Sequence, residues 1–208
     1  MKVLFIYNPR AGKERIRSNL LDIIDIFTKA GWEVTAYPTQ GEGDAVQRVI
    51  GASEEYELIC VSGGDGTLDE VVNGMMNRVK RCPIGFVPAG STNDFAMSLG
   101  IPTGMKAAAQ AIVGGEREAF DIGSLNGDAF TYVAAFGLFT EVSYETNQDM
   151  KNLFGHAAYV MEGAKKLSEI RSYAMRIRGD EFSLKGKFLY GMITNSVSVG
   201  GFKGITGD

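Results

Sequence analysis

Histidine and cysteine are scarce in this sequence of 208 residues, which contains one His and two Cys. His156 begins a predicted helix and has no Cys or acidic cluster at metal-ligand spacing, so we expect it to have a structural or capping role. A Ser-His-Asp hydrolase would also need a G-x-S-x-G motif, which is absent. Cys60 lies in an apolar run and Cys82 directly precedes Pro83, so we expect two buried, free thiols.

Long apolar runs and an excess of positive charge are also missing. No stretch reaches the roughly 18 apolar residues that span a bilayer, and the opening "MKVLFIYNP" is too short for a signal peptide. We therefore expect a cytoplasmic protein without a transmembrane segment. With 21 Lys and Arg against 25 Asp and Glu, the net charge is −4, which predicts no nucleic-acid partner. Any site for a polyanion must be local.

Residues 1–118 alternate short β-rich runs with helical patterns. This alternation favours an α/β domain built on a doubly wound parallel sheet with helices on both faces. The predicted strands are 2–7, 33–38, 57–62 and 84–88, and the predicted helices are 16–27, 43–52, 67–77, 92–99 and 104–114.

Residues 119–208 read differently, as a mainly antiparallel, β-sandwich-like domain. Asn126-Gly127 is a strong hairpin signal, a helix is predicted over 156–171, and a β-meander follows with turns at Gly179-Asp180 and Lys185-Gly186. The chain then stops in the glycine-rich "NSVSVGGFKGITGD", and the last predicted strand has no partner after it. We expect a truncated C-terminus; completion by a partner chain, as in a homodimer, is the alternative.

The stretch "LICVSGGDGTLDEVVNG" places three glycines, Asp65 and Thr67 between a predicted strand and a predicted helix. Glycine lets backbone approach a ligand closely, and a helix N-terminus offers free N–H groups and a favourable dipole to a phosphate. We therefore interpret Gly64 and Gly66 as part of a phosphate cradle. Asp65, an anion beside an anion, would act through a bound cation or water. An ordinary strand-to-helix turn is the alternative.

Two further polar loops follow predicted strands, "NPRAGK" at 8–13 and "PAGSTNDF" at 88–95. Loops at the carboxyl ends of strands form the ligand crevice of an open α/β sheet, so we expect the three loops to converge. The sequence lacks both the G-x-x-x-x-G-K-[ST] loop and the G-x-G-x-x-G fingerprint, which argues against a P-loop enzyme and a dinucleotide-binding protein.

In order and spacing, "NPRAG", "GGDGT" and "PAGSTND" resemble the diacylglycerol kinase catalytic-domain family, which includes bacterial lipid kinases and the sphingosine and ceramide kinases. The resemblance extends to "AAFGLFTEVSYET" and "FGHAAYVMEGAKKL", so it covers nearly the whole chain. The "GGDGT" motif alone also occurs in NAD kinases and 6-phosphofructokinases.

The resemblance implies a kinase that uses ATP and Mg²⁺ to phosphorylate a lipid hydroxyl, with diacylglycerol as the favoured substrate, at the membrane surface as a peripheral protein. Asp65 and Asp94 match the acidic, catalytic residues near the transferring phosphate and magnesium. The positions that match the nucleotide site are Asn8, Pro9, Arg10, Ala11, Gly12, Thr39, Gly64, Asp65, Gly66, Thr67, Leu68, Asp69, Glu70 and Ser91, the last standing where the family usually has Thr.

The same resemblance places a further magnesium-binding loop and the general base beyond Asp208, so the protein ligands of the metal are not assigned here. Two alternatives stay open: a phosphotransferase like NAD kinase, and a non-catalytic module that binds a nucleotide or a lipid.

Overall fold

The computed structural model describes residues 1–137, 172–195, 198–199 and 202–203. Its contacts divide the chain into unit 1, made of Met1–Tyr132 with Thr194–Asp208, and unit 2, Val133–Ile193. The predicted division at residue 118 stays a prediction. In the structure, the hairpin that follows this position belongs to unit 1.

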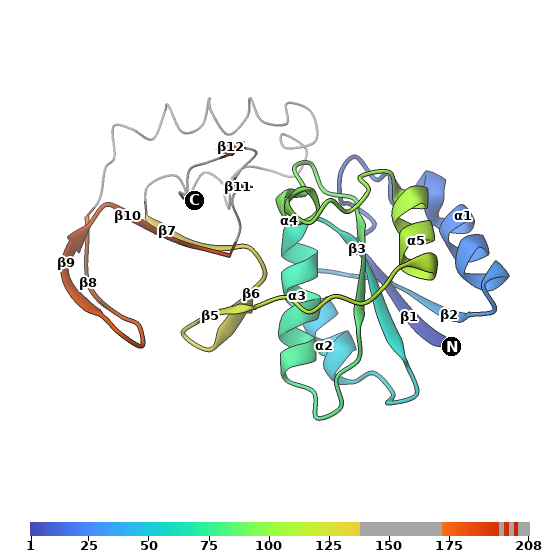
Figure 1. Cartoon of the computed structure of the whole chain (residues 1–208), viewed down its shortest axis with the longest axis horizontal. Helices are drawn as coiled ribbons and strands as arrows, with labels where there is room; N and C mark the ends of the chain where they lie inside the picture. The colour runs from blue at the N-terminus through green and yellow to red at the C-terminus, as the bar shows by residue number, and fades with distance from the viewer. Residues whose placement is uncertain (138–171, 196–197, 200–201, 204–208) are drawn as a thin grey trace. The chain divides into compact units, whose positions relative to one another are not determined.

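Unit 1 is built on a four-stranded parallel sheet in the order β2-β1-β3-β4 (Figure 1). The strands are β1 (Lys2–Tyr7), β2 (Glu33–Pro38), β3 (Leu58–Gly63) and β4 (Ile84–Pro88). All six residues of β3 are buried, as expected for a central parallel strand that is covered on both faces. The predicted parallel sheet is confirmed.

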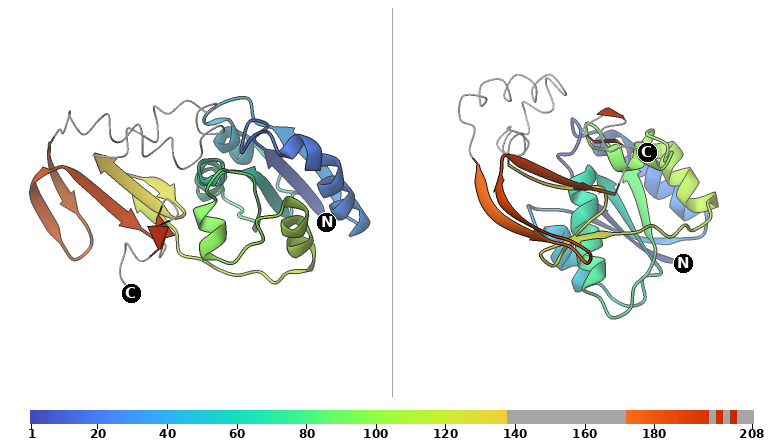
Figure 2. Two further views of the ribbon diagram at one scale, coloured as in Figure 1. Left: turned by 90° about the horizontal axis from the view of Figure 1, so that it is seen from above. Right: turned by 60° about the vertical axis from the view of Figure 1, so that its left-hand side comes forward.

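Helices cover both faces of this sheet, which confirms the doubly wound arrangement (Figures 1 and 2). On one face lie α1 (Ile16–Lys29) and α5 (Met105–Gly114), and on the other lie α2 (Asp44–Ile50) and α3 (Asp65–Met76). The short helix α4 (Asp94–Ser98) follows β4.

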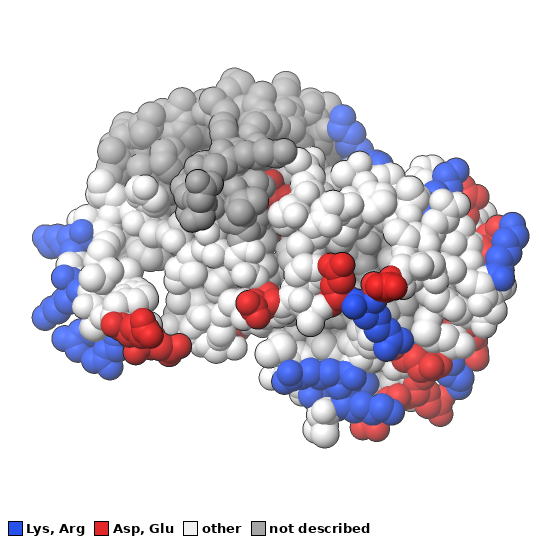
Figure 3. Space-filling model, in the orientation of Figure 1, with Lys and Arg blue, Asp and Glu red and all other residues white. Residues whose placement is uncertain are grey.

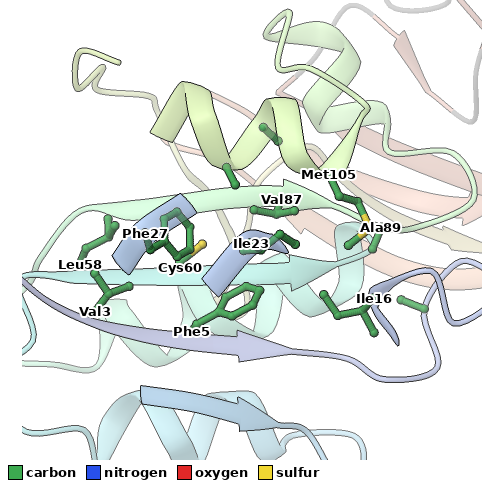
Figure 4. Close-up of a cluster of buried hydrophobic side chains, with 13 residues drawn as sticks. Val3, Phe5, Ile16, Ile23, Phe27, Leu58, Cys60, Val87, Ala89 and Met105 are labelled. Atoms are coloured by element: carbon green, nitrogen blue, oxygen red, sulfur yellow. The ribbon is translucent and has the colours of Figure 1, made fainter. Parts of the chain in front are cut away.

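A hydrophobic core lies between the sheet and α1 with α5 (Figure 4). The Phe27 ring meets Phe5 edge-on at 6.0 Å between centroids and stacks on Trp32 at 5.3 Å. Cys60 lies within this core, where burial raises the pKa of its thiol, and both cysteines are free. Cys82 is only half-buried.

The second core lies on the opposite face, between the sheet and α2 with α3. Successive residues of a strand point to opposite faces, so Leu4 and Ile6 belong to this core whereas Val3 and Phe5 belong to the first. The sheet is thus held firmly from both sides, and the loops at its carboxyl edge start from a rigid base.

A hairpin joins β5 (Gly123–Leu125) to β6 (Asp128–Phe130), with the two strands antiparallel. Its turn residues, Asn126 and Gly127, both have positive φ, at 55° and 97°. This geometry is that of a tight hairpin turn with two left-handed residues, for which Asn-Gly is favoured. The predicted turn is confirmed.

Unit 2 contains β7 (Val133–Gly137), β8 (Tyr173–Arg178) and β9 (Ser183–Phe188), and β10 (Tyr190–Thr194) pairs with β7. Strands β8 and β9 are antiparallel, and the predicted turn that follows β8 is present, with the Gly179 N–H donating to the carbonyl of Phe182.

One prediction about the β-rich region is wrong. Lys185 and Gly186 lie inside β9 and not in a turn, because their backbone groups pair with β8. The last predicted strand, β10, takes its partner, β7, from much earlier in the sequence and not from the residues after it. A short antiparallel pair, β11 (Ser198–Val199) and β12 (Phe202–Lys203), comes after it.

Two other predictions about this region have no outcome. The helix predicted over 156–171, with His156, lies outside the described residues. The sandwich-like arrangement of the strands stays a prediction.

Charged side chains of both signs are interspersed on the face shown in Figure 3. Several form exposed ion pairs, among them Lys2 with Glu55 and Lys29 with Asp25, each at 2.6 Å. Such surface pairs contribute little to stability. Among the helices that the structure describes, none combines the length and apolar character needed to cross a bilayer.

Candidate active site

The loops that follow β1, β3 and β4 start side by side at the carboxyl edge of the sheet. The N–H groups of Ala89 and Gly90 both donate to the carbonyl of Gly63, at 2.8 and 3.1 Å, and the N–H of Asn8 donates to the carbonyl of Ser62 at 2.8 Å. The hydrogen bonds of the sheet therefore continue into the loops. Because these bonds link neighbouring strands, each loop begins at a set distance from the next.

Thr39 extends the same arrangement to the edge strand. It is the first residue after β2, and its N–H donates to the carbonyl of Tyr7 at 2.9 Å. All four strands thus contribute a candidate residue at this edge.

Glycines bring the three loops into backbone contact. Gly12 adopts a left-handed conformation with φ of +50°, and a Cβ there would collide with the carbonyl oxygen of Ala89. A Cβ on Gly90 would lie 2.7 Å from the Cα of Gly64, which is closer than real Cβ atoms approach. A side chain at either position would push the loops apart, so these glycines are required for convergence.

Helix α3 begins at Asp65, two residues earlier than predicted. Gly64 is the extended residue before it, and its carbonyl accepts the N–H groups of Thr67 and Leu68 at 3.0 and 3.1 Å. The first N–H groups of a helix have no partner within the helix. Gly66 is exposed, and a Cβ there would meet no atom of the described residues within 4 Å. The first turn of α3 therefore presents an open surface with N–H donors.

The Asp65 carboxylate joins the glycine loop to α4. Its oxygens accept hydrogen bonds from the N–H groups of Asp94 and Phe95, each at 3.3 Å. Burial raises the pKa of Asp65 to about 6, the charges of Asp94 and Asp69 add to this effect, and the two N–H donors oppose it. Asp94 is 1% exposed, and one of its oxygens accepts the Tyr132 hydroxyl at 3.2 Å. The two predicted catalytic carboxylates therefore lie next to each other.

Asn93 shapes the loop that leads into α4. It has a positive φ of 53°, a conformation that Asn tolerates better than most residues. Its side-chain amide closes the loop by accepting the Gly90 N–H at 2.7 Å and donating to the Gly90 carbonyl at 2.9 Å. This side chain is 5% exposed, so it supports the loop from within.

Asn8 supports the first loop in a similar way. Its Oδ1 accepts the N–H of Arg10 at 2.9 Å, and its Nδ2 donates to the Thr67 hydroxyl at 3.4 Å. Ala11 is buried beneath the loop, Pro9 is half-buried, and Arg10 is exposed. Among these residues, the Arg10 side chain is thus the one most open to a ligand.

Three other predicted nucleotide residues, Leu68, Asp69 and Glu70, have side chains already engaged by the protein. Leu68 is 2% exposed within the second core. Asp69 accepts two hydrogen bonds from Thr131, and Glu70 accepts the N–H of Ala45 at 3.2 Å. Ser91 is exposed in its loop. The role of these residues in nucleotide binding stays a prediction.

Sequence reasoning missed the residues that attach β6 to α3. Asn73 and Thr131 make side-chain hydrogen bonds between these elements, and Tyr132 reaches Asp94. The sequence feature that could have pointed to this attachment is Asn73 itself, a polar residue eight positions after Asp65 on a helix whose other face is apolar. The partners of Asn73 lie 56 residues away, beyond what local patterns predict.

The donor set fits magnesium in its usual protein environment. Mg²⁺ is bound through one or two carboxylates together with substrate phosphates and water, not by a cage of protein ligands. Asp65 and Asp94 supply two carboxylates close enough for the charge of one to act on the other, and no group of three or more His, Cys, Asp or Glu suited to a metal occurs within the described part of the chain.

Together the fold and the loops define a doubly wound α/β protein whose three polar loops meet at the carboxyl ends of the strands, the edge at which such folds bind their ligands. The family model "Diacylglycerol kinase catalytic domain" matches residues 2–125. The chain belongs to this family.

Individual relatives agree with the family match. The chain is 39% identical to a diacylglycerol kinase of Staphylococcus carnosus, with 98% of this chain and 67% of that protein covered. It is 36% identical to a diacylglycerol kinase of Bacillus subtilis, with coverages of 98% and 68%. A crystal structure of a diacylglycerol kinase from Bacillus anthracis matches with a TM-score of 0.72 and 27% identity, over 97% of this chain and 68% of that one. The chain thus spans about two thirds of the length of these relatives.

Proposed function

We propose that this chain binds ATP with Mg²⁺ at the three-loop crevice and belongs to a kinase that transfers the γ-phosphoryl group to the hydroxyl of diacylglycerol. The observation that carries the proposal is the close backbone contact of Gly12 with Ala89 and of Gly90 with Gly64, where a Cβ on Gly12 or Gly90 would collide with the neighbouring loop. Such a surface suits phosphate groups, which bind to backbone N–H donors.

Phosphoryl transfer relies on positioning and on neutralising charge rather than on covalent chemistry by the protein. The first turn of α3 would hold phosphate oxygens beside Gly66, where the protein leaves space. Asn8 and Asn93 would keep the adjoining loops in place through their side-chain amides. The crevice therefore has both a phosphate surface and a fixed frame.

The Asp65 and Asp94 carboxylates would hold Mg²⁺ beside the bound phosphates. When bound, the ion would neutralise negative charge that develops on the phosphates during transfer. Asp65 is kept in place by the α4 amides, so its carboxylate is already oriented.

The lipid acceptor is supported by the family and by the relatives, which are named diacylglycerol kinases. Because this lipid resides in a membrane, we propose a cytoplasmic protein that works as a peripheral enzyme at the inner membrane face. A homodimer stays a prediction from the sequence.

Two measurements test the proposal. Calorimetric titration of ATP into the chain, with and without Mg²⁺, should show saturable binding that strengthens with the metal. The full reading frame that contains the chain should transfer radiolabel from ATP to diacylglycerol in vesicles. Transfer to NAD in place of lipid would favour the NAD kinase alternative, whereas nucleotide binding without any transfer would favour a binding module.

A further inference from the structure

One face of α3 carries three polar side chains at a spacing of four residues, Asp65, Asp69 and Asn73. Residues four apart lie above one another on a helix, so these side chains form a stripe along it. Each side chain makes hydrogen bonds to a segment later in the chain: Asp65 to the start of α4, and Asp69 and Asn73 to residues 129–131. We call these three residues the α3 stripe.

Asn73 binds Ala129 through both backbone groups of that residue. Its Oδ1 accepts the Ala129 N–H at 2.8 Å, and its Nδ2 donates to the Ala129 carbonyl at 2.7 Å. The side-chain amide makes the pair of hydrogen bonds that a peptide group of a neighbouring strand would make, because it offers the same donor and acceptor. Asn73 therefore fixes the position of β6 along α3.

Asp69 repeats the attachment one helical turn closer to the glycine loop. Its Oδ1 accepts the Thr131 N–H at 2.8 Å and the Thr131 hydroxyl at 2.6 Å. Thr131 is 1% exposed, so this contact is shielded from water. The helix positions 73 and 69 thus pair with Ala129 in β6 and with Thr131 just after it, which sets the register between α3 and β6.

The next residue after this attachment is Tyr132, whose hydroxyl lies 3.2 Å from an oxygen of the buried Asp94. The Asp94 N–H in turn donates to Asp65, at the start of the α3 stripe. The contacts therefore close into a ring: α3, β6, Tyr132, Asp94 and back to α3. A shift of β6 along α3 would move the Tyr132 hydroxyl relative to the Asp94 carboxylate.

We propose that Asn73 and Tyr132 are positioning residues for the transfer step, with Asn73 fixing β6 so that the Tyr132 hydroxyl orients the Asp94 carboxylate. This inference rests on the proposed function, because it assigns Asp94 to phosphoryl transfer. Neither residue needs to touch ATP or lipid. Their loss should therefore affect turnover more than nucleotide binding.

The kinetic test compares Asn73→Leu, Tyr132→Phe and the double variant in the full reading frame. The matched control is Asn77→Leu, one turn further along α3, where the exposed side chain donates to the carbonyl of Asn73 and not to β6. We expect each ring variant to lower kcat at least about tenfold while the KM for ATP changes less than about twofold, and we expect the control to match wild type.

Because both residues act through one contact, the double variant should be no slower than the slower single variant. Losses that multiply, a rise in KM without a fall in kcat, or an unchanged kcat in Tyr132→Phe would each overturn the proposal. Tyr132→Phe removes a single hydroxyl, so it remains informative if Asn73→Leu fails to fold.

Amide hydrogen exchange tests the contacts of the ring independently of phosphate transfer, so it distinguishes an error in this inference from an error in the proposed function. In Asn73→Leu, the N–H groups of Thr131 and Asp94 should exchange faster than in wild type, whatever reaction the protein performs. Unchanged exchange at both would overturn the ring. A different result is that Asn73→Leu speeds exchange at Thr131 and Asp94 as expected while the wild-type protein transfers no phosphate. That result would overturn the proposed function, and with it the assignment of these residues to the transfer step.

Discussion

Gly12 lies directly against the carbonyl of Ala89, so that a methyl group on Gly12 would collide with that oxygen. The loop after β1 therefore touches the loop after β4, although the two strands are not neighbours in the sheet and β3 lies between them. The contact depends on a residue without a side chain, and on one that adopts a φ of +50°. It brings the two loops together past the end of β3, which lies between their strands.

Gly12→Ala should destabilise the protein and weaken nucleotide binding. The left-handed backbone and the collision with Ala89 both act against the substitution, so we expect a loss of more than about 1 kcal/mol in the free energy of unfolding. Chemical denaturation and ATP titration measure the two effects. Gly41→Ala is the matched control, because a Cβ on Gly41 would have no atom of the described residues within 4 Å and the methyl group should be tolerated. Equal behaviour of the two variants would contradict the prediction.

Gly66→Ala should weaken ATP binding without lowering the stability of the protein. No atom of the described residues lies within 4 Å of an added Cβ, and Ala favours a helix over Gly by up to about 1 kcal/mol, so stability should be kept or raised. If phosphates occupy the space beside this residue, ATP affinity should fall at least about tenfold. Thermal unfolding and calorimetry on the same sample decide it. Wild-type affinity in this variant would place the phosphates elsewhere.

Asp65→Asn should reduce turnover far more than ATP affinity. A carboxylate that acts through a cation matters most where charge develops during transfer, so we expect kcat to fall about 100-fold or more. Steady-state kinetics at several Mg²⁺ concentrations, in the full reading frame, provide the measurement. Turnover near that of wild type would rule out the metal-linked role.

Asp69→Asn should stabilise the protein at high pH. Burial raises the pKa of Asp69, although both hydrogen bonds from Thr131 oppose the shift. The folded protein therefore holds this proton more tightly than the unfolded chain, whose Asp has a pKa of about 3.9. Above the folded pKa, the buried charge costs stability. As pH falls through the folded pKa this cost disappears, so the advantage of the neutral Asn should shrink.

Thermal unfolding from about pH 8 down to about pH 4 tests this sign, because the range spans ordinary and raised Asp pKa values. Asn can still accept both hydrogen bonds at Oδ1, which keeps the contact with Thr131. The exposed Asp128, replaced by Asn, serves as the control and should show little change across the range. A stability difference in Asp69→Asn that is constant with pH would contradict the prediction.

The amino-acid sequence determined the elements of unit 1 almost residue by residue. Strands β1, β2 and β4 match their predicted bounds, because short apolar runs between glycine, proline and polar residues are typical of buried strands. The Asn126-Gly127 turn was equally plain, since few residue pairs tolerate two positive φ angles. The three polar loops were likewise visible from composition and position alone.

Tertiary structure decided which distant groups meet. Asp69 and Asn73 bind residues that lie 62 and 56 positions later, and Tyr132 reaches Asp94 from 38 positions away. Strand β10 pairs with β7, and Lys185 and Gly186 continue a strand where their residue types favour a turn. Local preferences act over a few residues, whereas these partners are chosen by the packing of whole elements and by the need to pair every buried polar group.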